Sequence, residues 1–282
     1  MQKVVFVTYD QRPDLSASDQ LVADALRPLG VEVVAIPWGR PAATYAGSRA
    51  IILRSNWDYP KDPEAFSGWL DSIAHLPVFN SATTVQQNLY KTYLAELKQA
   101  GIKVPRTALL APSSDVGKLM AELGLTEAVV KPVCGASGAM VQRIDLNTAA
   151  TWRQEISPVF ANRDFLLQEL VTEIAQGEIS MAFFAGQFSH AVLKIPAAGE
   201  FRINSQYQGH IQPYSPSEDL IKQGADVLST LPEPPLYARV DGVLRNNDFL
   251  LFELELNEPS FFFTVVPEAA TNFARAIADQ LG

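Results

Sequence analysis

Three acidic residues and one arginine near the end of the chain have the spacing of a shared polar patch. In the segment 252–257 apolar residues alternate with polar ones, so Glu253 and Glu255 fall on one side of a strand. Arg239 and Asp241 share a face of the preceding strand in the same way. If the two strands form a hairpin of the right register, the pattern predicts that all four polar side chains lie together.

The length of the hairpin loop decides this register. With a three-residue loop, Asn246-Asn247-Asp248, residue Asp241 lies opposite Glu253. A two-residue turn would place the acids on opposite faces, because a slip of one residue reverses every side chain. Asn and Asp tolerate the left-handed conformation that a three-residue loop with a bulge requires. We therefore expect the three-residue loop.

Close carboxylates need a cation or a proton. Two unit charges about 4 Å apart repel by roughly 4 kcal/mol at an effective dielectric constant near 20. Oxygen ligands without a nearby His or Cys favour Mg²⁺, with Mn²⁺ as an alternative. A solvated strand face would explain the acids equally simply, but apolar runs flank them. We interpret Asp241, Glu253 and Glu255 as metal ligands.

A lysine in an apolar strand precedes a loop of small residues. Lys131 lies in the run 128–133 and is costly to bury without an anionic partner. In the following loop, the backbone of Gly135, Ser137 and Gly138 can approach phosphate oxygens closely. An ordinary hairpin with glycine in its turn is the alternative. Together, the lysine and the loop favour a phosphate site.

Composition excludes several classes of protein. The 282 residues carry a formal net charge of −9, which argues against nucleic acid as a partner. One cysteine excludes an internal disulfide and a cysteine-based zinc site. The N-terminus lacks the pattern of a signal peptide, and no apolar run is long enough to span a bilayer. We expect a cytoplasmic protein without a membrane partner. A homodimer is the commonest assembly for such a protein.

The sequence pattern of the first third of the chain predicts a small α/β lobe. Strands at 3–8, 31–36 and 50–53 with a helix between the first two indicate a parallel sheet, without dinucleotide-binding or P-loop motifs. Ligands bind beyond the carboxyl ends of such strands, where Arg54 could clamp a carboxylate. Alternatively, Arg54 pairs with Asp58. The residues that we expect to bind a substrate are Arg54, Ser55 and Trp57.

Taken in order, these features resemble the ATP-grasp ligases. The residues that carry the resemblance are Lys91 in a predicted helix 85–100, Lys131-Pro132 before the Gly135–Gly138 loop, Gln168-Glu169-Leu170-Val171, Glu178, Arg202, Arg239-x-Asp241 and Glu253-x-Glu255 with Pro259. The resemblance implies an α/β ATP-grasp fold. It has a small N-terminal lobe with a parallel sheet, followed by two α+β lobes that bind ATP between them. We expect the N-terminal lobe at 1–84 and the ATP-grasp region at 85–282, with a lid at 104–167 and a C-terminal part at 168–282.

The resemblance also implies roles. Those for ATP are phosphate contacts for Lys91 and Lys131, closure over the phosphates for Gly135, Ser137 and Gly138, adenine binding for Glu169 and the Val171 backbone, ribose binding for Glu178, and a further contact to the cofactor for Gln168. Asp241, Glu253 and Glu255 would hold Mg²⁺, although many members have Asn where Glu255 stands. Arg202 and Arg239 would stabilise the transferred phosphoryl group, and Arg202 would also contact the substrate.

A narrower resemblance is to the ATP-grasp branch that includes the cycloserine-pathway cyclo-ligase acting on O-ureido-serine. Its signature includes Leu53-Arg54-Ser55-x-Trp57-Asp58-Tyr59 and Glu258-Pro259-Ser260. It implies an enzyme that activates the carboxylate of an amino-acid derivative as an acyl phosphate and closes a ring through an amine. The alternatives are a ligase that joins two amino acids or peptides, an ATP-dependent small-molecule kinase, and a binding protein without chemistry.

Overall fold

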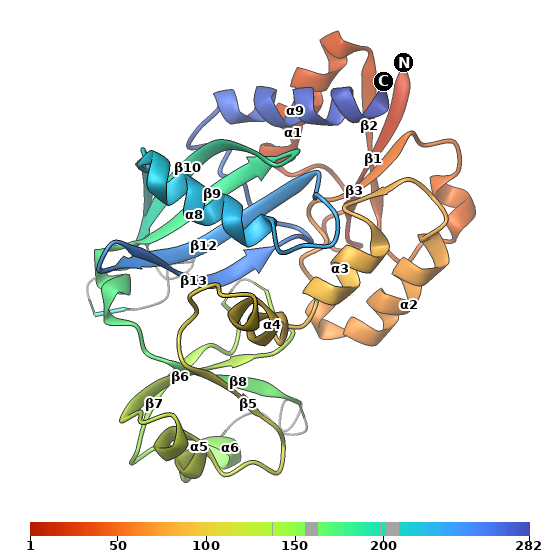
Figure 1. The fold of residues 1–282 in the computed structure, drawn as a ribbon. Helices are drawn as coiled ribbons and strands as arrows, with labels where there is room; N and C mark the ends of the chain where they lie inside the picture. The colour runs from red at the N-terminus through yellow and green to blue at the C-terminus, as the bar shows by residue number, and fades with distance from the viewer. Residues whose placement is uncertain (137, 156–162, 198, 201–208) are drawn as a thin grey trace.

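The computed structural model describes residues 1–136, 138–155, 163–197, 199–200 and 209–282. Two predicted site residues, Ser137 and Arg202, lie outside these residues. The described residues form three β-sheets with helices packed against them, and the two chain ends lie close together (Figure 1). The predicted α/β class is confirmed.

The N-terminal sheet is parallel, as expected. Its order is β2-β1-β3-β4, and β1 is buried along most of its length because helices and loops cover both faces. Its strands are β1 (Gln2–Thr8), β2 (Val31–Pro37), β3 (Ala50–Leu53) and β4 (Val78–Phe79). The helices and 3₁₀ turns of this lobe are α1 (Ala17–Leu26), η1 (Arg27–Leu29), η2 (Ala42–Tyr45), η3 (Tyr59–Lys61), α2 (Pro63–Ile73) and α3 (Ala82–Asn88).

The last helix, α9 (Glu268–Leu281), packs beside α1 on this lobe rather than extending away from it (Figure 1). Its apolar residues, among them Phe273 and Ile277, are buried in one core with Val4 and Phe6 of β1. The end of the chain therefore fixes the N-terminal lobe to the sheet that precedes α9.

A smaller antiparallel sheet forms the part of the molecule below the central sheet in Figure 1. Its order is β5-β8-β6-β7, and α5 (Val116–Glu122) and α6 (Trp152–Glu155) pack on it around a separate core. Its strands are β5 (Thr107–Leu110), β6 (Glu127–Pro132), β7 (Gln142–Asp145) and β8 (Phe165–Glu169). We call it the lid sheet.

The central sheet is antiparallel, with the order β11-β10-β9-β12-β13. Its strands are β9 (Glu178–Phe184), β10 (Gln187–Ile195), β11 (His210–Tyr214), β12 (Tyr237–Arg245) and β13 (Asp248–Glu255), accompanied by η4 (Thr172–Gln176) and α8 (Glu218–Leu228). One face carries Met181, Val240 and Leu254 and packs against α8 and α4 (Tyr93–Gln99). The other face carries the polar residues of the site.

The predicted continuous helix 85–100 is wrong. The chain forms α3 and α4 with a break between them, and Lys91 lies in the break. The Lys91 amide donates to the carbonyl of Val133 at 2.8 Å, so it is unavailable for a helical bond. The Tyr93 hydroxyl also exchanges hydrogen bonds with the backbone of Leu254. Tertiary contacts thus replace one helical turn.

The β12–β13 hairpin confirms the predicted pairing but not the predicted loop. Asp241 lies opposite Glu253, as expected. However, the loop has two residues, Asn246 (φ 56°) and Asn247 (φ 68°), both in the left-handed conformation typical of a tight hairpin turn. The pairing shifts between Asp241 and Gly242, which leaves Phe252 as an extra residue in β13. This β-bulge restores the register that a two-residue turn alone would lose.

Gly242 has no room for a side chain at the bulge, so we predict that Gly242→Ala destabilises the protein. A Cβ atom there would lie 2.3 Å from the Leu250 carbonyl oxygen. Overpacking of this kind costs about 1–3 kcal/mol, which urea denaturation would measure. Gly68→Ala in α2, where nothing lies within 4 Å, is the matched control and should gain about 0.5–1 kcal/mol. Equal stability of Gly242→Ala and the wild type would contradict this account of the bulge.

Candidate active site

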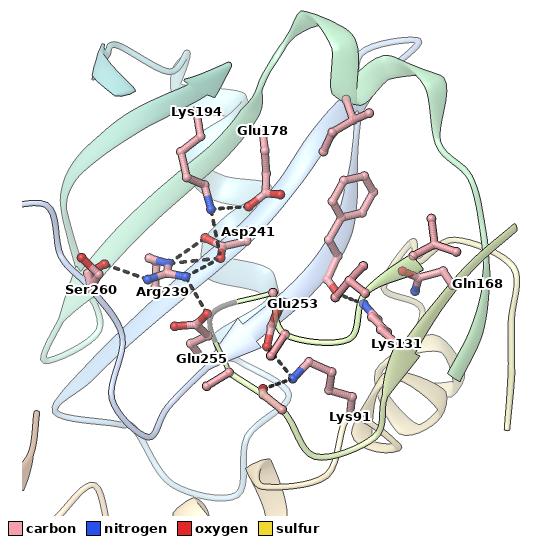
Figure 2. Close-up of a pocket in the computed structure, with 18 of the residues that line it drawn as sticks. Lys91, Lys131, Gln168, Glu178, Lys194, Arg239, Asp241, Glu253, Glu255 and Ser260 are labelled. Carbon is pink, nitrogen blue, oxygen red and sulfur yellow. Dashed lines mark hydrogen bonds and ion pairs between the residues drawn. The ribbon is translucent and has the colours of Figure 1, made fainter. Parts of the chain in front are cut away.

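A cavity of about 610 Å³ is lined by the polar face of the central sheet and by residues of the lid sheet. Lys131 and Gln168 line it from the lid sheet, and Ser18 of α1 and the segment after β13 line it elsewhere. Figure 2 shows the charged residues converging on this space from β9, β10, β12 and β13. Three separate parts of the chain therefore contribute to one cavity.

Asp241 is the most tightly held acid in the cavity. It is buried, accepts a hydrogen bond of 2.6 Å from the Ser180 hydroxyl, and forms a bidentate pair with Arg239. Lys194 lies 3.6 Å away. Burial alone would raise its pKa, but the two cations and the hydrogen bonds outweigh burial and lower the pKa of Asp241 to about 2. Asp241 is therefore a carboxylate throughout the neutral range.

Glu255 shares Arg239 with Asp241 but is held less firmly. One guanidinium nitrogen lies 2.6 Å from the Glu255 carboxylate, and another donates to the Ser260 carbonyl at 2.8 Å (Figure 2). Burial raises the pKa of Glu255 to about 7, with Glu253 and Asp241 adding to the rise and Arg239 opposing it. Near neutral pH this side chain thus carries only part of a negative charge.

Glu253 is paired with Lys91 from the break between α3 and α4. The Lys91 ammonium lies 3.0 Å from the Glu253 carboxylate and donates to the Gly135 carbonyl at 2.8 Å. Burial raises the pKa of Glu253, but the opposing effect of Lys91 and Lys131 is larger, so the pKa of Glu253 is lowered overall. Lys91 therefore connects β13 to the small-residue loop after β6.

Lys131 projects from the lid sheet towards the bulge of β13. Its ammonium lies 3.5 Å from the carbonyl oxygen of Phe252, the extra residue. Burial lowers its pKa to about 8. Among the residues that the structure describes, no carboxylate forms an ion pair with it. A buried cation in this state is suited to an anionic ligand.

Lys194 was not predicted from the sequence as a site residue. It lies in β10 directly opposite Glu178 in β9, and its ammonium forms ion pairs with Glu178 and Asp241. Burial raises the pKa of Glu178 despite Lys194. The pairing of β9 with β10 could have indicated this contact, but a register shift between Phe188 and His190 conceals it in the sequence.

The side chains of Gln168 and Glu169, both expected to contact ATP, are engaged with protein groups. The Glu169 carboxylate accepts from Arg106 at 3.0 Å and from Arg245 at 2.9 Å. Arg245 also binds Glu173 at 2.6 and 3.0 Å. The Gln168 amide donates to Thr107 at 3.0 Å. Glu169, Leu170 and Val171 still line the cavity, so their backbone is the remaining means of contacting a base.

The predicted substrate residues of the N-terminal lobe do not line the cavity. Arg54 is 3% exposed and its guanidinium donates to Asp19 at 2.8 Å and to the Pro259 carbonyl at 3.1 Å, so the expected carboxylate clamp is already occupied. The alternative pairing with Asp58 is wrong, because Arg54 pairs with Asp19. Ser55 donates to the same Asp19 at 2.5 Å, and Trp57 contacts Tyr9.

Asp241, Glu253 and Glu255 lie on one face as predicted, but each is held by a cation of the protein (Figure 2). In the described ranges, no three His, Cys, Asp or Glu side chains are close enough to hold one metal ion as they stand. The expected coordination group is therefore not assembled. The oxygen donors and their burial nevertheless fit a hard divalent cation, which could take over the charge balance that Lys91 and Arg239 now provide.

Comparison with known proteins identifies the class. Residues 91–236 match the ATP-grasp domain of prokaryotic glutathione synthetase, and residues 4–80 match the N-terminal domain of the D-cycloserine synthetase DcsG. The chain therefore belongs to the ATP-grasp family. It is an ATP-dependent ligase that joins a carboxylate to an amine, forming a C–N bond with release of ADP and phosphate.

Among individual proteins, the cycloserine biosynthesis protein DcsG of Streptomyces lavendulae is 27% identical over 292 residues, covering 98% of this chain and 95% of that protein. The crystal structure of D-cycloserine synthetase DcsG has a TM-score of 0.86 at 25% identity, covering 99% of this chain and all of that one. D-alanine–D-alanine ligase from Bacillus anthracis shares the fold, with a TM-score of 0.71 at 14% identity and coverage of 100% and 97%.

Among the described helices, none is long and apolar enough to cross a membrane.

The lowered pKa of Lys131 predicts how the use of ATP depends on pH. Below about pH 8 the ammonium is charged and above it the amine is neutral, so kcat/KM for ATP should fall as pH rises through that value. Lys131→Arg keeps its charge and should abolish this decline. The exposed Lys222→Arg is the control and should keep the wild-type profile. If kcat/KM for ATP fell with pH in Lys131→Arg as it does in the wild type, Lys131 would not be the group that titrates.

Arg245 fixes the segment 169–173, which we expect to face the nucleobase, so we predict that Arg245→Gln raises KM for ATP by about tenfold with a smaller effect on kcat. The reason is that Glu169 and Glu173 lose a shared charged partner, at a cost of about 1–3 kcal/mol. Arg143→Gln breaks the exposed pair with Glu127 and serves as the control. Steady-state kinetics would contradict the prediction if both variants kept the wild-type KM.

Proposed function

We propose that this ligase closes a ring within one small amino-acid derivative. The observation that carries the proposal is the match of residues 4–80 to the N-terminal domain of D-cycloserine synthetase, together with the similarity over 98% of the chain. The N-terminal lobe contributes Ser18 to the cavity, so the part of the chain that matches D-cycloserine synthetase also reaches the site.

In the proposed reaction, the terminal phosphoryl group of ATP is transferred to the substrate carboxylate. Lys91 and Lys131 bind phosphate oxygens, with the loop from Gly135 to Gly138 over them. Lys194 of β10 and Arg239 of β12, on the two strands that flank β9, neutralise charge on the group in transit. A nitrogen of the same substrate then displaces phosphate from the acyl carbon, and the ring forms.

The adenosine part has a separate region of the cavity. The backbone of residues 169–171 contacts the adenine, and Ile174 and Phe252 provide apolar walls. Glu178 contacts the ribose in this proposal, and in the structure it forms an ion pair with Lys194. The three acids Asp241, Glu253 and Glu255 would hold Mg²⁺, or Mn²⁺, entering with the nucleotide. The ion would neutralise phosphate charge when bound.

The lobes have matching tasks in this proposal. Residues 1–84 supply the substrate end, the lid at 104–167 covers the phosphates, and residues 168–282 carry the acids and bind adenosine. We further propose that the enzyme acts in the cytoplasm on a freely diffusing amino-acid-like substrate, with Arg202 as a candidate contact to it, and that a homodimer is its simplest assembly.

The test measures three products at once. The enzyme is incubated with ATP, Mg²⁺ and O-ureido-D-serine, or with single amino acids and dipeptides, and ADP, phosphate and organic product are quantified. We expect cycloserine with equal amounts of ADP and phosphate, and with the carbamoyl group of the substrate released by hydrolysis as carbon dioxide and ammonia. Peptide products alone would support an intermolecular ligase, and a stable phosphorylated product without free phosphate would support a kinase. Either outcome would overturn the proposal.

The acidic residues provide the matched variants for the same assay. Glu253→Gln should lower turnover by about 100-fold, because it removes a carboxylate that would hold the Mg²⁺ ion neutralising the phosphates. Glu127→Gln, in an exposed pair on the lid sheet, should retain wild-type turnover. Undiminished turnover in Glu253→Gln would show that this residue holds no metal needed for the reaction.

A further inference from the structure

Phe262 lines the cavity from the segment that follows β13. Its two neighbours in sequence, Phe261 and Phe263, are fully buried and pack against Phe273 of α9, with ring centroids 5.4 and 6.0 Å apart. These two anchors leave Phe262, which is only partly buried, at the cavity. The arrangement places one aromatic ring of a consecutive trio at the site, held by the core on both sides.

The backbone of Phe262 has an unusual conformation. Its φ is 55°, in the left-handed region that bulky aromatic residues rarely adopt. Its carbonyl accepts hydrogen bonds from the amides of Val265 at 2.8 Å and Val266 at 2.9 Å, which hold the turn. A strained residue that its surroundings keep in place at a site is a reason to examine its function.

The ring of Phe262 lies over two cations of the site. The guanidinium carbon of Arg239 is 5.4 Å from the ring centroid, and the Lys194 ammonium is 5.9 Å from it. Both distances are within the range of cation–π contacts. These are the two cations that neutralise the phosphoryl group in the proposed reaction, and both contact Asp241. The ring therefore covers the two cations on the side of the cavity where, in the proposed reaction, the acyl phosphate forms.

We propose that Phe262 protects the acyl phosphate from hydrolysis, an inference that rests on the proposed function. If water reaches the acyl carbon, its oxygen adds there, the bond from carbon to the bridging oxygen breaks, and phosphate leaves with the carboxylic acid restored. One ATP is then consumed without a C–N bond. A ring that excludes water leaves the substrate nitrogen as the nucleophile that reaches the carbon.

The ratio of phosphate released to ring product formed tests this role directly. With O-ureido-D-serine the wild type should give a ratio of about one, since each acyl phosphate yields one product. Phe262→Gly removes the ring and accepts the left-handed backbone, so it should fold and raise the ratio several-fold. Phe262→Leu keeps part of the apolar cover and should raise it less; it also supplies the measurement if Phe262→Gly does not turn over.

Phe252→Ala is the matched control, because Phe252 lines the same cavity beside the expected adenine position. It should raise KM for ATP and leave the ratio near the wild-type value. If both Phe262 variants turn over more slowly at an unchanged ratio, Phe262 serves packing alone and the inference is wrong. Failure of the proposed function gives a different result from failure of this inference. In that case the wild type would join two separate substrates instead of closing a ring, and the ratio of phosphate to product would be measured with those two substrates.

Discussion

The pairing of β12 with β13 is the constraint on which the rest of the site depends. It places Asp241 opposite Glu253 and Arg239 opposite Glu255 on a face that buries Asp241 and Arg239 and half-buries the two glutamates, where unpaired carboxylates would be costly. Lys91 is brought from the N-terminal side and Lys194 from β10 to balance these acids. The fold around the cavity can therefore be understood as the means of bringing cations to one acidic hairpin.

The sequence predicted this hairpin with the right partners and the wrong loop. Strand periodicity identified which residues share a face, because alternation depends only on neighbours in the chain. The loop was wrong because the two left-handed residues Asn246 and Asn247 and the bulge at Phe252 compensate for one another. Bulges arise where the backbone must redirect a side chain, and here the displaced carbonyl of Phe252 faces Lys131.

The errors elsewhere have a common cause in long-range contacts. Lys91 lies in a helical sequence, but a hydrogen bond to Val133 interrupts the helix. Arg54 follows a strand as a ligand-binding arginine would, but Asp19 of α1 holds it. Local patterns show the type of an element, whereas the partner of a buried charge depends on packing between lobes. The family could nevertheless be predicted, because several individually weak motifs follow one another in the order typical of ATP-grasp ligases.

Above all, we infer that the acidic hairpin receives a divalent cation together with the nucleotide. The most direct measurement is calorimetric titration of ADP into wild type and Glu253→Gln, with and without Mg²⁺. We predict that Mg²⁺ tightens ADP binding to the wild type by at least about fivefold and has little effect on the variant. Equal affinity of the wild type for ADP with and without Mg²⁺ would contradict the claim.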